Sequence, residues 1–572
     1  MTLIYNDKYD IIDENISDSQ LGSRKNKALR SHTFIVSGII NEALVKKKEI
    51  DVIITDYRQA YDSLFLESIL NDLYDSGVQD DQLNLIHKSD CSSLVAVKTD
   101  VGLTDRAEVK KKVLQGEKLG PIKCSNTVDK IGKQCLEENK YLYTYRENVK
   151  CPPLALVDDV LAIAKCGADS VEMNSFLNTQ TNIKKLQYGT NKCHKMHVGK
   201  DRAVCPDLNI DSWKLKPKSE MVEDIFDQEE FEDGLAALEE VDHDSYLGDI
   251  LENTGSNKRN IQARVAKGIN AGKTVIQMLE EVCFGPYTTE VFLILRNSLM
   301  LSTLLSNGES WYRVSKENIE SLESVDIQII RQQFKLHSKT PTPYLYLDLG
   351  LVPVRFLLMK RRILFLWWIT NQSADSLIFE FFQAQENDSY RGDWSRMVKE
   401  DLKNLDINLT IDQIKCASKE ELKHFLNKQI EEQAFKYLIN QKNKYSKMSG
   451  LKYDKLKLQN FFCSDEKLMP SEISSIMQIR SRMLPVKNNF KSLFQSDKME
   501  CRGCLDKNSI EDEKHILLCP VLNSNCPSTN NSPIYEDIFS DNPKKIIEVV
   551  RMIMTNHSKL KQLLDKTAPS AP

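Results

Sequence analysis

Apolar runs that end in carboxylates stand out in the first third of the chain. Residues 154–164 are apolar on both sides of Asp158 and Asp159. Asp often turns the chain between two strands, and an unpaired buried charge is costly. The pattern predicts a β-hairpin with both carboxylates at its tip, where a partner or a metal ion neutralises them. The alternative is a hairpin in which the Asp pair only makes the turn.

A second apolar, β-branched run at residues 52–55 ends at Asp56 and predicts another strand. Two strands that each bring an Asp to the same end of a sheet can hold Mg²⁺, which prefers carboxylate and phosphate oxygens. Two such ions about 3.5–4 Å apart stabilise the attacking and leaving oxygens in phosphoryl transfer. Asp56 and Asp158 are the predicted bridging pair, with Asp159 beside them.

Helical periodicity predicts most of the remaining elements. The expected helices are 32–46, 63–77, 171–186, 256–284, 288–305 and 543–564, and a short strand is expected at 94–99. Ser256 is a plausible N-cap. Basic residues that could face nucleic acid are Lys118, Lys123, Lys130, Lys258, Arg259, Arg264, Lys267 and Lys273. Ordinary solvated surface is the alternative for these side chains.

Cysteine and histidine spacing near the end of the chain predicts a metal site. The pattern Cys-x2-Cys-x10-His-x3-Cys comprises Cys501, Cys504, His515 and Cys519. Three thiolates and an imidazole suit tetrahedral Zn²⁺, and a short helix is expected to carry His515 and Cys519 on neighbouring turns. Cys526 is an alternative fourth ligand, and Cys463 is a more distant one. A purely structural staple is one possible role of this site.

Five motifs along the chain resemble, in order, those of a reverse transcriptase palm. They are Asp56 with Tyr61, Gln115-Gly116 followed by Gly120-Pro121, Val157-Asp158-Asp159, Asn191-Lys192-Cys193, and Tyr246-Leu247-Gly248. The layout is most similar to the reverse transcriptases of non-LTR (LINE-like) retrotransposons and runs from about residue 21 to residue 520. One departure is Gly120, where the family usually has Ser or a similar residue.

The resemblance implies roles for individual residues. Tyr61 would close off the space of a ribose 2′-OH and so select dNTPs, although ordinary packing is its alternative. Gln115 and Gly116 would approach the template, and Lys192 would protonate the departing pyrophosphate unless it is plain surface. The turn Tyr246-Leu247-Gly248 would seat the primer end. From its place in the Asp56 turn, Arg58 either reaches a triphosphate or is solvated.

The implied fold class is α+β, a right-hand polymerase palm with partial fingers, a helical thumb, a helical C-terminal extension and a small zinc knuckle. The expected boundaries are 1–48 partial fingers, 49–252 palm, 253–340 thumb, 341–498 helical extension, 499–526 zinc knuckle, and 527–572 linker, C-terminal helix and tail. Little chain precedes the segment Leu21-Gly22-Ser23-Arg24, which resembles part of the fingers. We therefore expect an N-terminally truncated enzyme.

The charge composition permits a nucleic-acid-binding protein but does not require one. The net charge of the 572 residues is −5, but residues 220–249 hold thirteen Asp and Glu and no Lys or Arg. Without that block, 77 basic residues face 69 acidic ones, a balance that permits phosphate binding. The block itself is expected to be a solvated, flexible excursion.

The cellular context follows from cysteine usage and hydropathy. The 14 cysteines are mostly scattered singly, as in a reducing compartment, so a nuclear or cytoplasmic protein is expected. The N-terminus lacks the pattern of a signal peptide. Residues 351–370 are the most apolar segment, but charges near its centre interrupt it, which favours a core helix over a membrane helix.

The sequence therefore predicts an RNA-directed DNA polymerase that acts by two-metal nucleotidyl transfer onto a primer 3′-OH. Two Mg²⁺ ions and Zn²⁺ are the expected cofactors, and an RNA template, a DNA primer and dNTPs are the expected partners. The family associates a Cys/Cys/His/Cys cluster after the thumb with template nucleic acid. A catalytically inactive nucleic-acid-binding remnant of such an enzyme is the alternative, because the missing fingers would normally bind the triphosphate. The oligomeric state stays open.

Overall fold

The computed structural model describes most of the chain as two compact units. It covers residues 2–91, 94–96, 98–105, 107–108, 119–138, 141–201, 205–215, 231–282, 288–463, 468–490, 499–506, 508–523 and 534–567. Unit 1 is drawn from residues 1–260, 309–314 and 365–400, and unit 2 from 261–308, 315–364 and 401–572. Both units therefore combine segments that lie far apart in the sequence. The predicted domain boundaries, which are single breaks in chain order, stay a prediction.

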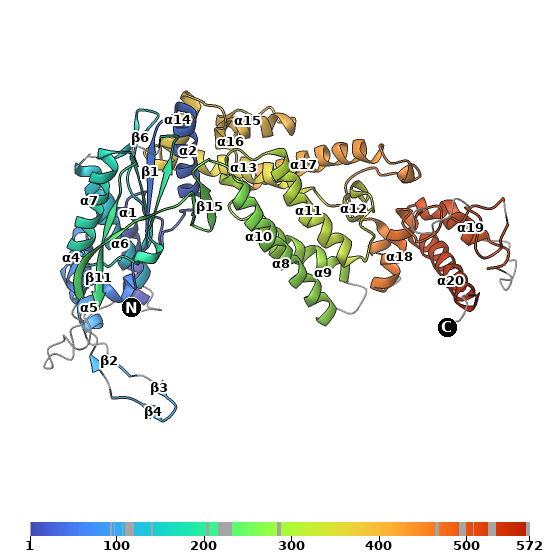
Figure 1. Cartoon of the computed structure of the whole chain (residues 1–572), viewed down its shortest axis with the longest axis horizontal. Coiled ribbons are helices and arrows are strands. Elements are labelled where there is room, and N and C mark those ends of the chain that lie inside the picture. Colours follow the sequence, from blue (N-terminus) through green and yellow to red (C-terminus); the bar gives the residue numbers. More distant parts are fainter. Residues whose placement is uncertain are drawn as a thin grey trace. The chain divides into compact units, whose positions relative to one another are not determined.

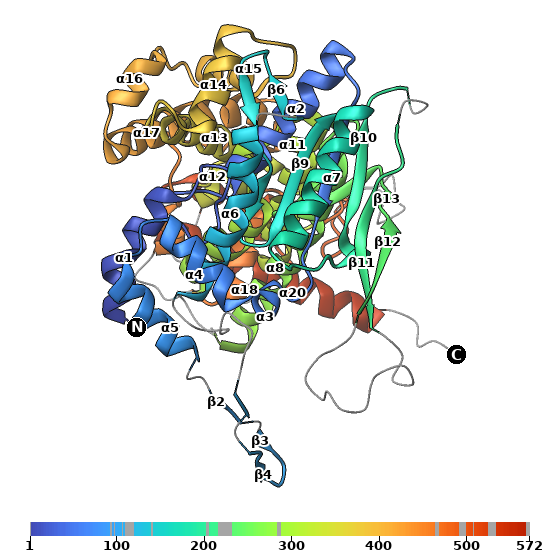
Figure 2. The same cartoon turned by 90° about the vertical axis from the view of Figure 1, so that its left-hand side faces the viewer.

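A five-stranded sheet lies at the centre of unit 1. Its strands are β1 (Ile50–Thr55), β8 (Leu154–Leu156), β9 (Asp159–Lys165), β10 (His194–Val198) and β13 (Glu239–Glu240). They lie in the order β13-β10-β1-β9-β8. Figure 2 labels β9, β10 and β13 of this sheet. Because β1 runs antiparallel to both β9 and β10, the start of β1 lies beside the ends of its two neighbours. The end of β1 correspondingly lies beside the start of β9, where Thr55 is opposite Val160.

Helices cover this sheet. Those of unit 1 are α1 (Thr2–Asn15), α2 (Arg30–Lys46), α3 (Ala60–Ser63), α4 (Leu66–Asp75), α5 (Asp80–Cys91), α6 (Gly120–Glu138), α7 (Ala168–Ile183) and α14 (Leu377–Asn387). Figure 1 shows α7 and α2 on opposite sides of β1. All six residues of β1 are buried, which explains why its apolar run does not alternate with polar positions.

Short two-stranded pairs complete the β structure of unit 1. They are β2 (Leu94–Val95) with β5 (Ala107–Glu108), β3 (Lys98–Thr99) with β4 (Gly102–Leu103), β6 (Tyr143–Tyr145) with β7 (Val149–Cys151), β11 (Asn209–Leu215) with β12 (Phe231–Ala237), and β14 (His243–Tyr246) with β15 (Asp249–Glu252). The expectation that residues 220–249 are a flexible excursion is thus wrong from residue 231 onward. Backbone hydrogen bonds order this stretch despite its charge, because β12 pairs with β11, β13 with β10 and β14 with β15.

Aromatic residues from distant segments form part of the core of unit 1. The ring of Phe34 in α2 packs edge-on against those of Phe365, Phe381 and Trp394, with ring centroids 5.2–5.8 Å apart. Edge-to-face contacts at this spacing are the favoured geometry of aromatic pairs. The fully buried Phe381 is therefore part of the core of unit 1.

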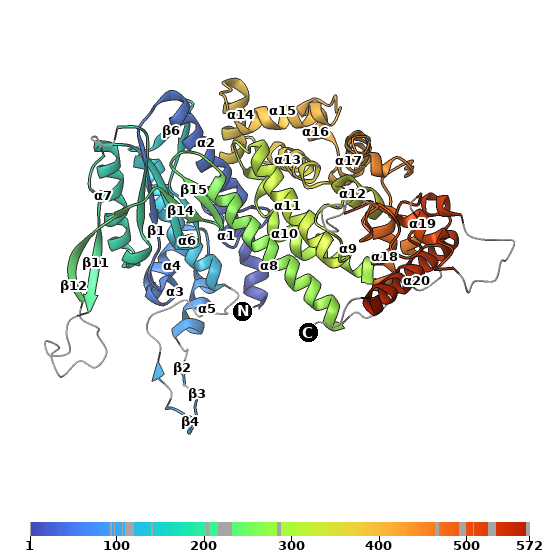
Figure 3. The same cartoon turned by 45° about the vertical axis from the view of Figure 1, so that its right-hand side comes forward.

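Unit 2 is helical in its described part. Its elements, three of which also contribute residues to unit 1, are α8 (Lys258–Val282), α9 (Thr288–Leu295), a π-helical segment (Arg296–Met300), α10 (Leu301–Leu304), α11 (Lys316–Gln333), α12 (Thr342–Leu349), α13 (Val354–Thr370), α15 (Trp394–Asn404), α16 (Ile411–Cys416), α17 (Lys419–Lys442), α18 (Pro470–Arg480), α19 (Glu513–Leu518) and α20 (Pro543–Thr567). In Figure 3, α8, α10 and α11 lie together. Gly272 permits this approach, since a Cβ there would lie 2.5 Å from Ile329 of α11.

Charged residues inside these helices are neutralised by partners. Arg296 and Asp326 form a buried ion pair at 2.6 Å, and Arg362 of α13 pairs with Asp401 at 2.5 Å. A buried charge without such a partner would be strongly destabilising. None of the described helices combines the length and the apolar character that a membrane span requires.

Several predicted elements are confirmed with small shifts in their ends. They include the helices α2, α7, α8 and α20 and the strand β1. The hydroxyl of Ser256 accepts a hydrogen bond from the backbone N–H of Lys258 at 3.0 Å, as expected at the start of α8. The predicted strand at 94–99 is instead two short strands, β2 and β3.

Candidate active site

The predicted hairpin is present, and its tip carries both carboxylates. Strands β8 and β9 pair antiparallel, with Leu156 opposite Asp159, so Val157 and Asp158 form a two-residue turn. Val157 adopts a left-handed conformation with φ 58°, as the first residue of a tight hairpin turn often does. Asp158 lies in the turn, and Asp159 is the first residue of β9.

Asp56 lies at the same end of the sheet as this hairpin. It follows β1 directly, and the last residue of that strand, Thr55, is paired with Val160 of β9. The Thr55 hydroxyl donates to the Val160 carbonyl at 3.2 Å, which fixes the two strand ends together. The antiparallel register therefore brings Asp56, Asp158 and Asp159 to the same end of the sheet.

The three carboxylates repel one another electrostatically. Burial raises the pKa of Asp159 to about 6, and the charges of Asp158 and Asp56 add to this effect. Burial also raises the pKa of Asp158, with a further contribution from Asp56. A raised carboxyl pKa means that ionisation is disfavoured, so a bound cation would relieve the repulsion. The site therefore favours binding of positive charge.

Lys192 supplies one positive charge to this end of the sheet. Its Nζ lies 3.3 Å from Asp56 Oδ1, while its side chain is 71% exposed and open to solvent. The backbone N–H of Gly189 donates to the Asp56 carbonyl at 2.8 Å, which holds the Lys192 segment beside β1. Lys192 can thus approach a ligand bound at Asp56 from the solvent side.

Gln20, which the sequence analysis did not single out, holds the turn that carries Asp158. Its Oε1 accepts hydrogen bonds from the backbone N–H groups of Val157 and Gly22, each at 2.8 Å. Its Nε2 donates to the Val157 carbonyl at 3.1 Å. Gly22 packs so closely that a Cβ there would lie 2.5 Å from the Val157 nitrogen. The fully buried Gln20 is therefore a positioning residue for this hairpin.

Replacing Gln20 by Leu should loosen the hairpin without removing a carboxylate. Four backbone groups, the fourth being the Ser125 carbonyl, would lose their hydrogen bond to Gln20, which is expected to lower the free energy of unfolding by about 1–3 kcal/mol. If the carboxylates catalyse the nucleotidyl transfer that the sequence predicts, displacement of Asp158 should lower its kcat by up to roughly a hundredfold, with a smaller change in KM. Steady-state kinetics and denaturant unfolding measure the two effects.

Gln385→Leu is the matched control for that experiment. Gln385 is also buried in unit 1 and has two hydrogen-bond partners, Tyr312 and the backbone of Ser395, away from the carboxylates. It should lose a similar amount of stability and keep its kcat. Equal loss of kcat in both variants would show that Gln20 acts only through global stability.

Tyr61 lies near the carboxylates, and Arg58 is exposed. Burial raises the pKa of Tyr61 to about 12, with added contributions from Cys124 and from the charge of Asp158. The half-buried ring of Tyr61 packs against the hydrophobic core of unit 1. Arg58 is anchored by its backbone N–H, which donates to the Gln187 carbonyl at 2.7 Å, so its side chain is available to a ligand.

The proposed primer-seating segment is a tight turn with an inward-facing tyrosine. Leu247 and Gly248 both have positive φ, 50° and 84°, between the paired strands β14 and β15. The Tyr246 side chain is buried, and its hydroxyl lies 3.1 Å from Nδ1 of His32. Tyr246 therefore supports the turn from inside.

Other predicted contacts have mixed outcomes. Gln115 and Gly116 lie outside the described residues, as does Lys118. Lys123 and Arg264 are buried, so the expectation that their side chains face nucleic acid is wrong. Both occupy faces of helices that pack inward, which a count of basic residues along the chain does not reveal. Lys258, Arg259, Lys267 and Lys273 are exposed as expected.

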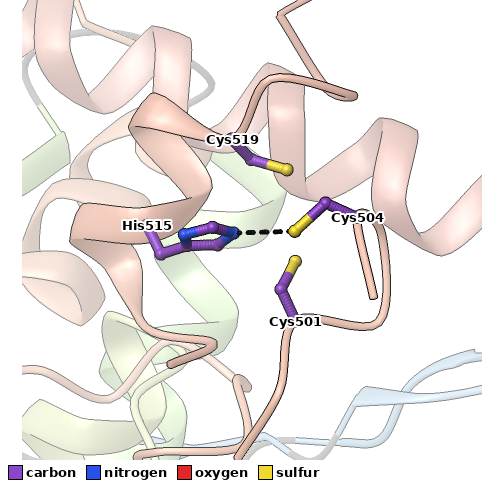
Figure 4. A group of neighbouring side chains, drawn as sticks. All are labelled: Cys501, Cys504, His515 and Cys519. Atoms are coloured by element: carbon purple, nitrogen blue, oxygen red, sulfur yellow. Dashed lines mark hydrogen bonds between the residues drawn. The ribbon is translucent and has the colours of Figure 1, made fainter. Parts of the chain in front are cut away.

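The structure brings the four predicted zinc ligands together. We call Cys501, Cys504, His515 and Cys519 the knuckle cluster, and its ligand atoms all lie within 4.8 Å of one another. Figure 4 shows the three sulfur atoms and the imidazole turned toward a common space. The nearest pair that forms a hydrogen bond is Cys504 Sγ and His515 Nε2, at 3.4 Å. Cys463 is elsewhere and exposed, and Cys526 lies outside the described residues.

Polar contacts preorganise the knuckle cluster. Buried Glu511 accepts hydrogen bonds from the Arg502 guanidinium at 2.6 and 2.8 Å, which ties the first Cys pair to the approach to α19. Asp512 caps that helix by accepting from the backbone N–H of His515 at 2.8 Å. Burial raises the pKa of Cys504, but hydrogen bonds from Asp506, Ser509 and His515 outweigh it and hold the pKa at about 7.

Comparisons with known proteins give only distant similarity. No protein-family model matches the chain, and no curated protein matches it. Among solved structures, apo telomerase from Candida tropicalis is 12% identical, with 70% of this chain and 59% of that chain covered and a TM-score of 0.30. Telomerase from the same organism with the TWJ fragment of telomeric RNA is 12% identical, with 67% and 53% covered and a TM-score of 0.31. The corresponding Candida albicans complex is 11% identical, with 66% and 52% covered and a TM-score of 0.27. The chain spans between half and three fifths of the length of these three telomerases.

Proposed function

We propose that this chain is an RNA-directed DNA polymerase of a LINE-like retrotransposon, which extends a DNA primer on an RNA template. The observation that carries the proposal is the convergence of Asp56, Asp158 and Asp159 at one end of the sheet, beside the ammonium group of Lys192. The carboxylates come from motifs that resemble those of reverse transcriptases in order along the chain. The LINE-like assignment rests on that resemblance.

The ligand atoms at this end of the sheet suit Mg²⁺. All three side chains offer carboxylate oxygens, and burial, with a smaller contribution from the neighbouring carboxylates, raises the pKa of Asp158 and of Asp159, so a bound cation would stabilise their ionised forms. Asp56 and Asp158 would hold two Mg²⁺ ions, with Asp159 in support. When bound, such ions stabilise the attacking 3′-oxygen and the leaving pyrophosphate oxygens of nucleotidyl transfer.

The surrounding residues divide the remaining tasks. Lys192, whose Nζ is 3.3 Å from Asp56 Oδ1, would donate a proton to the pyrophosphate as it leaves the α-phosphorus that the primer 3′-oxygen attacks. Arg58 adds a second exposed cation for the triphosphate. The ring of Tyr61 would exclude a ribose 2′-OH, and the turn at Leu247 and Gly248 would seat the primer end.

For the knuckle cluster, we propose Zn²⁺ as the metal. Three thiolates and one imidazole within 4.8 Å are a soft donor set that favours Zn²⁺ over Mg²⁺. Because the ligands come from a loop and a short helix, binding would hold the small C-terminal region together. Contact with the template strand is a second role that the resemblance implies for it.

One observation favours the alternative of a non-catalytic nucleic-acid-binding remnant. Arg24 belongs to the segment that resembles the fingers, yet its side chain is only 6% exposed and pairs with Asp13 at 2.7 Å. It is thus unavailable to a triphosphate. A chain that binds primer and template but lacks triphosphate contacts would retain its carboxylates without using them.

Primer extension by the full chain distinguishes the two functions. A labelled DNA primer annealed to an RNA template is incubated with the protein, Mg²⁺ and dNTPs, and binding is measured in parallel. Extension of the primer supports the polymerase. Tight binding of the primer–template without any extension would favour the remnant.

The Tyr61→Ala variant should incorporate rNTPs. If the ring is the barrier to a 2′-OH, its removal is expected to raise the kcat/KM for rNTPs relative to dNTPs by roughly 10- to 100-fold. Single-nucleotide incorporation assays measure this ratio. Tyr74→Ala is the control, because that tyrosine is exposed on α4 and should leave the ratio unchanged. An unaltered dNTP preference in Tyr61→Ala would remove Tyr61 from sugar selection.

A further inference from the structure

A second group of metal-ligand side chains lies at the other end of the central sheet. We call this group the Asp51 cluster, and its members are Asp51, Cys166, His197 and Cys205. Asp51 is near the start of β1, Cys166 follows β9, and His197 is near the end of β10. The antiparallel pairing of β1 with both neighbours brings these three together, with Asp51 directly opposite His197. The Asp51 cluster is therefore distinct from the site of Asp56, Asp158 and Asp159, which lies at the opposite end of the sheet.

The donor atoms of the Asp51 cluster suit a borderline-soft metal. One carboxylate oxygen, one imidazole nitrogen and two sulfurs all lie within 4.8 Å of one another. Two sulfurs make Mg²⁺ or Ca²⁺ a poor match, because both prefer oxygen ligands. Cys sulfur, His nitrogen and Asp oxygen are all ligands of Zn²⁺, and four such donors suit its tetrahedral geometry.

One buried carboxylate oxygen of Asp51 has no hydrogen-bond partner among the described residues, and a bound metal would give it a partner. Its side chain is completely buried, and Oδ2 has no hydrogen-bond partner among the described residues. Its other oxygen, Oδ1, lies 2.9 Å from Nδ1 of His197. A buried carboxylate oxygen without a partner is costly, so this atom points to a ligand at the cluster.

His197 is oriented as metal-binding histidines usually are. Nδ1 is on the Asp51 side, while Nε2 lies 3.0 Å from Glu49 Oε2. If Nδ1 binds a metal, Nε2 carries the proton and donates it to Glu49. A carboxylate that accepts from the second ring nitrogen fixes the tautomer and raises the basicity of the ligand.

Lys195 offsets part of the charge of such a site. Its Nζ lies 3.0 Å from Cys205 Sγ and 2.7 Å from the Pro206 carbonyl, and its side chain is only 3% exposed. One carboxylate and two thiolates around a divalent cation leave one net negative charge, which this ammonium group would offset in part, because it also pairs with Glu240 Oε2 at 3.3 Å. Compensated charge is the condition under which ionic groups are tolerated in a protein interior.

We propose that the Asp51 cluster binds one Zn²⁺ ion. The ion would join the start of β1 to the ends of β9 and β10 and so brace the sheet at the end opposite Asp56 and Asp158. The proposal concerns a structural metal and does not depend on the polymerase activity. It is also independent of the metal content of the knuckle cluster.

Zinc content per chain tests the site in the full-length protein. The parent, purified in reducing buffer, is compared by elemental analysis with Cys205→Ser and with Cys416→Ser. Cys205→Ser should contain one zinc equivalent fewer than the parent, whatever the knuckle cluster holds. Cys416→Ser, which alters an exposed cysteine outside both clusters, should match the parent. Full retention of zinc in Cys205→Ser would overturn the proposal.

A second measurement needs no variant and so avoids misfolding. Thiol alkylation of the parent is followed by peptide mass spectrometry, with and without a zinc chelator. Bound metal should protect Cys166 and Cys205, and chelation should expose both to the reagent, while Cys416 reacts throughout. Equal reaction of Cys166 and Cys205 in both conditions would overturn the proposal, as would a Cys166–Cys205 disulfide in place of the metal.

Discussion

Asp158→Asn is expected to lower primer extension by at least roughly a hundred- to a thousandfold relative to the parent chain. The amide keeps the size of the side chain but removes one of the charges that would hold Mg²⁺. Metal stabilisation of charge in the transition state is worth several kcal/mol, and each 1.36 kcal/mol is about tenfold in rate. Single-turnover extension of a labelled primer on an RNA template measures the effect.

Asp169→Asn is the matched control for this loss. Asp169 lies in the first turn of α7 in the same unit and is outside the site. It should extend the primer like the parent, and both variants should bind the primer–template equally well. Extension by Asp158→Asn within tenfold of the parent would exclude this carboxylate from the mechanism, even if the polymerase assignment held.

Cys519→Ser is expected to release one zinc equivalent and to unfold the region around the knuckle cluster. Structural zinc in small domains contributes on the order of 10 kcal/mol of apparent binding free energy at neutral pH. Cys519 is fully buried beside α19, whose packing against α20 includes a hydrogen bond from Asn556 to the Ile516 carbonyl at 3.0 Å. Hydrogen exchange should accelerate at residues 499–523 and stay unchanged in β1.

Cys463→Ser serves as the control for the knuckle cluster. Cys463 is exposed and outside the cluster, so its replacement should leave zinc content and exchange as in the parent. If Cys519→Ser bound as much zinc as the parent, Cys519 would not be a ligand, and Cys526 would become the candidate for the fourth position. Zinc loss without faster local exchange would contradict the stapling role.

Local patterns in the sequence were enough to predict the elements that carry the candidate site. The β-branched run before Asp56 predicts β1, and the apolar runs around Asp158 and Asp159 predict the hairpin. Both signals are local, because strand propensity and turn preference act over a few residues. The Cys and His spacing of the knuckle cluster is equally local, since all four ligands lie within 19 residues.

Partners that lie far apart along the chain were not predictable in this way. Gln20 reaches the Val157 turn across 137 residues, and no pattern near Gln20 identifies the turn that it contacts. Burial was misjudged where a basic side chain lies on the inner face of a helix, as at Lys123 and Arg264. Tyr246 also faces inward. Its hydroxyl contacts His32 of α2, which lies 214 residues earlier in the chain.

The sequence by itself determined which residues can carry chemistry, namely the Asp residues after apolar runs and the Cys and His residues at short spacing. Only the tertiary structure decided which side chains meet, including those of the Asp51 cluster, which follow neither pattern. Antiparallel pairing of β1 with β9 and β10 places Asp56 with Asp158 at one end of the sheet and Asp51 with His197 at the other. Strand register is set by long-range packing and hydrogen bonds, so residues 146 positions apart become neighbours without any local signal.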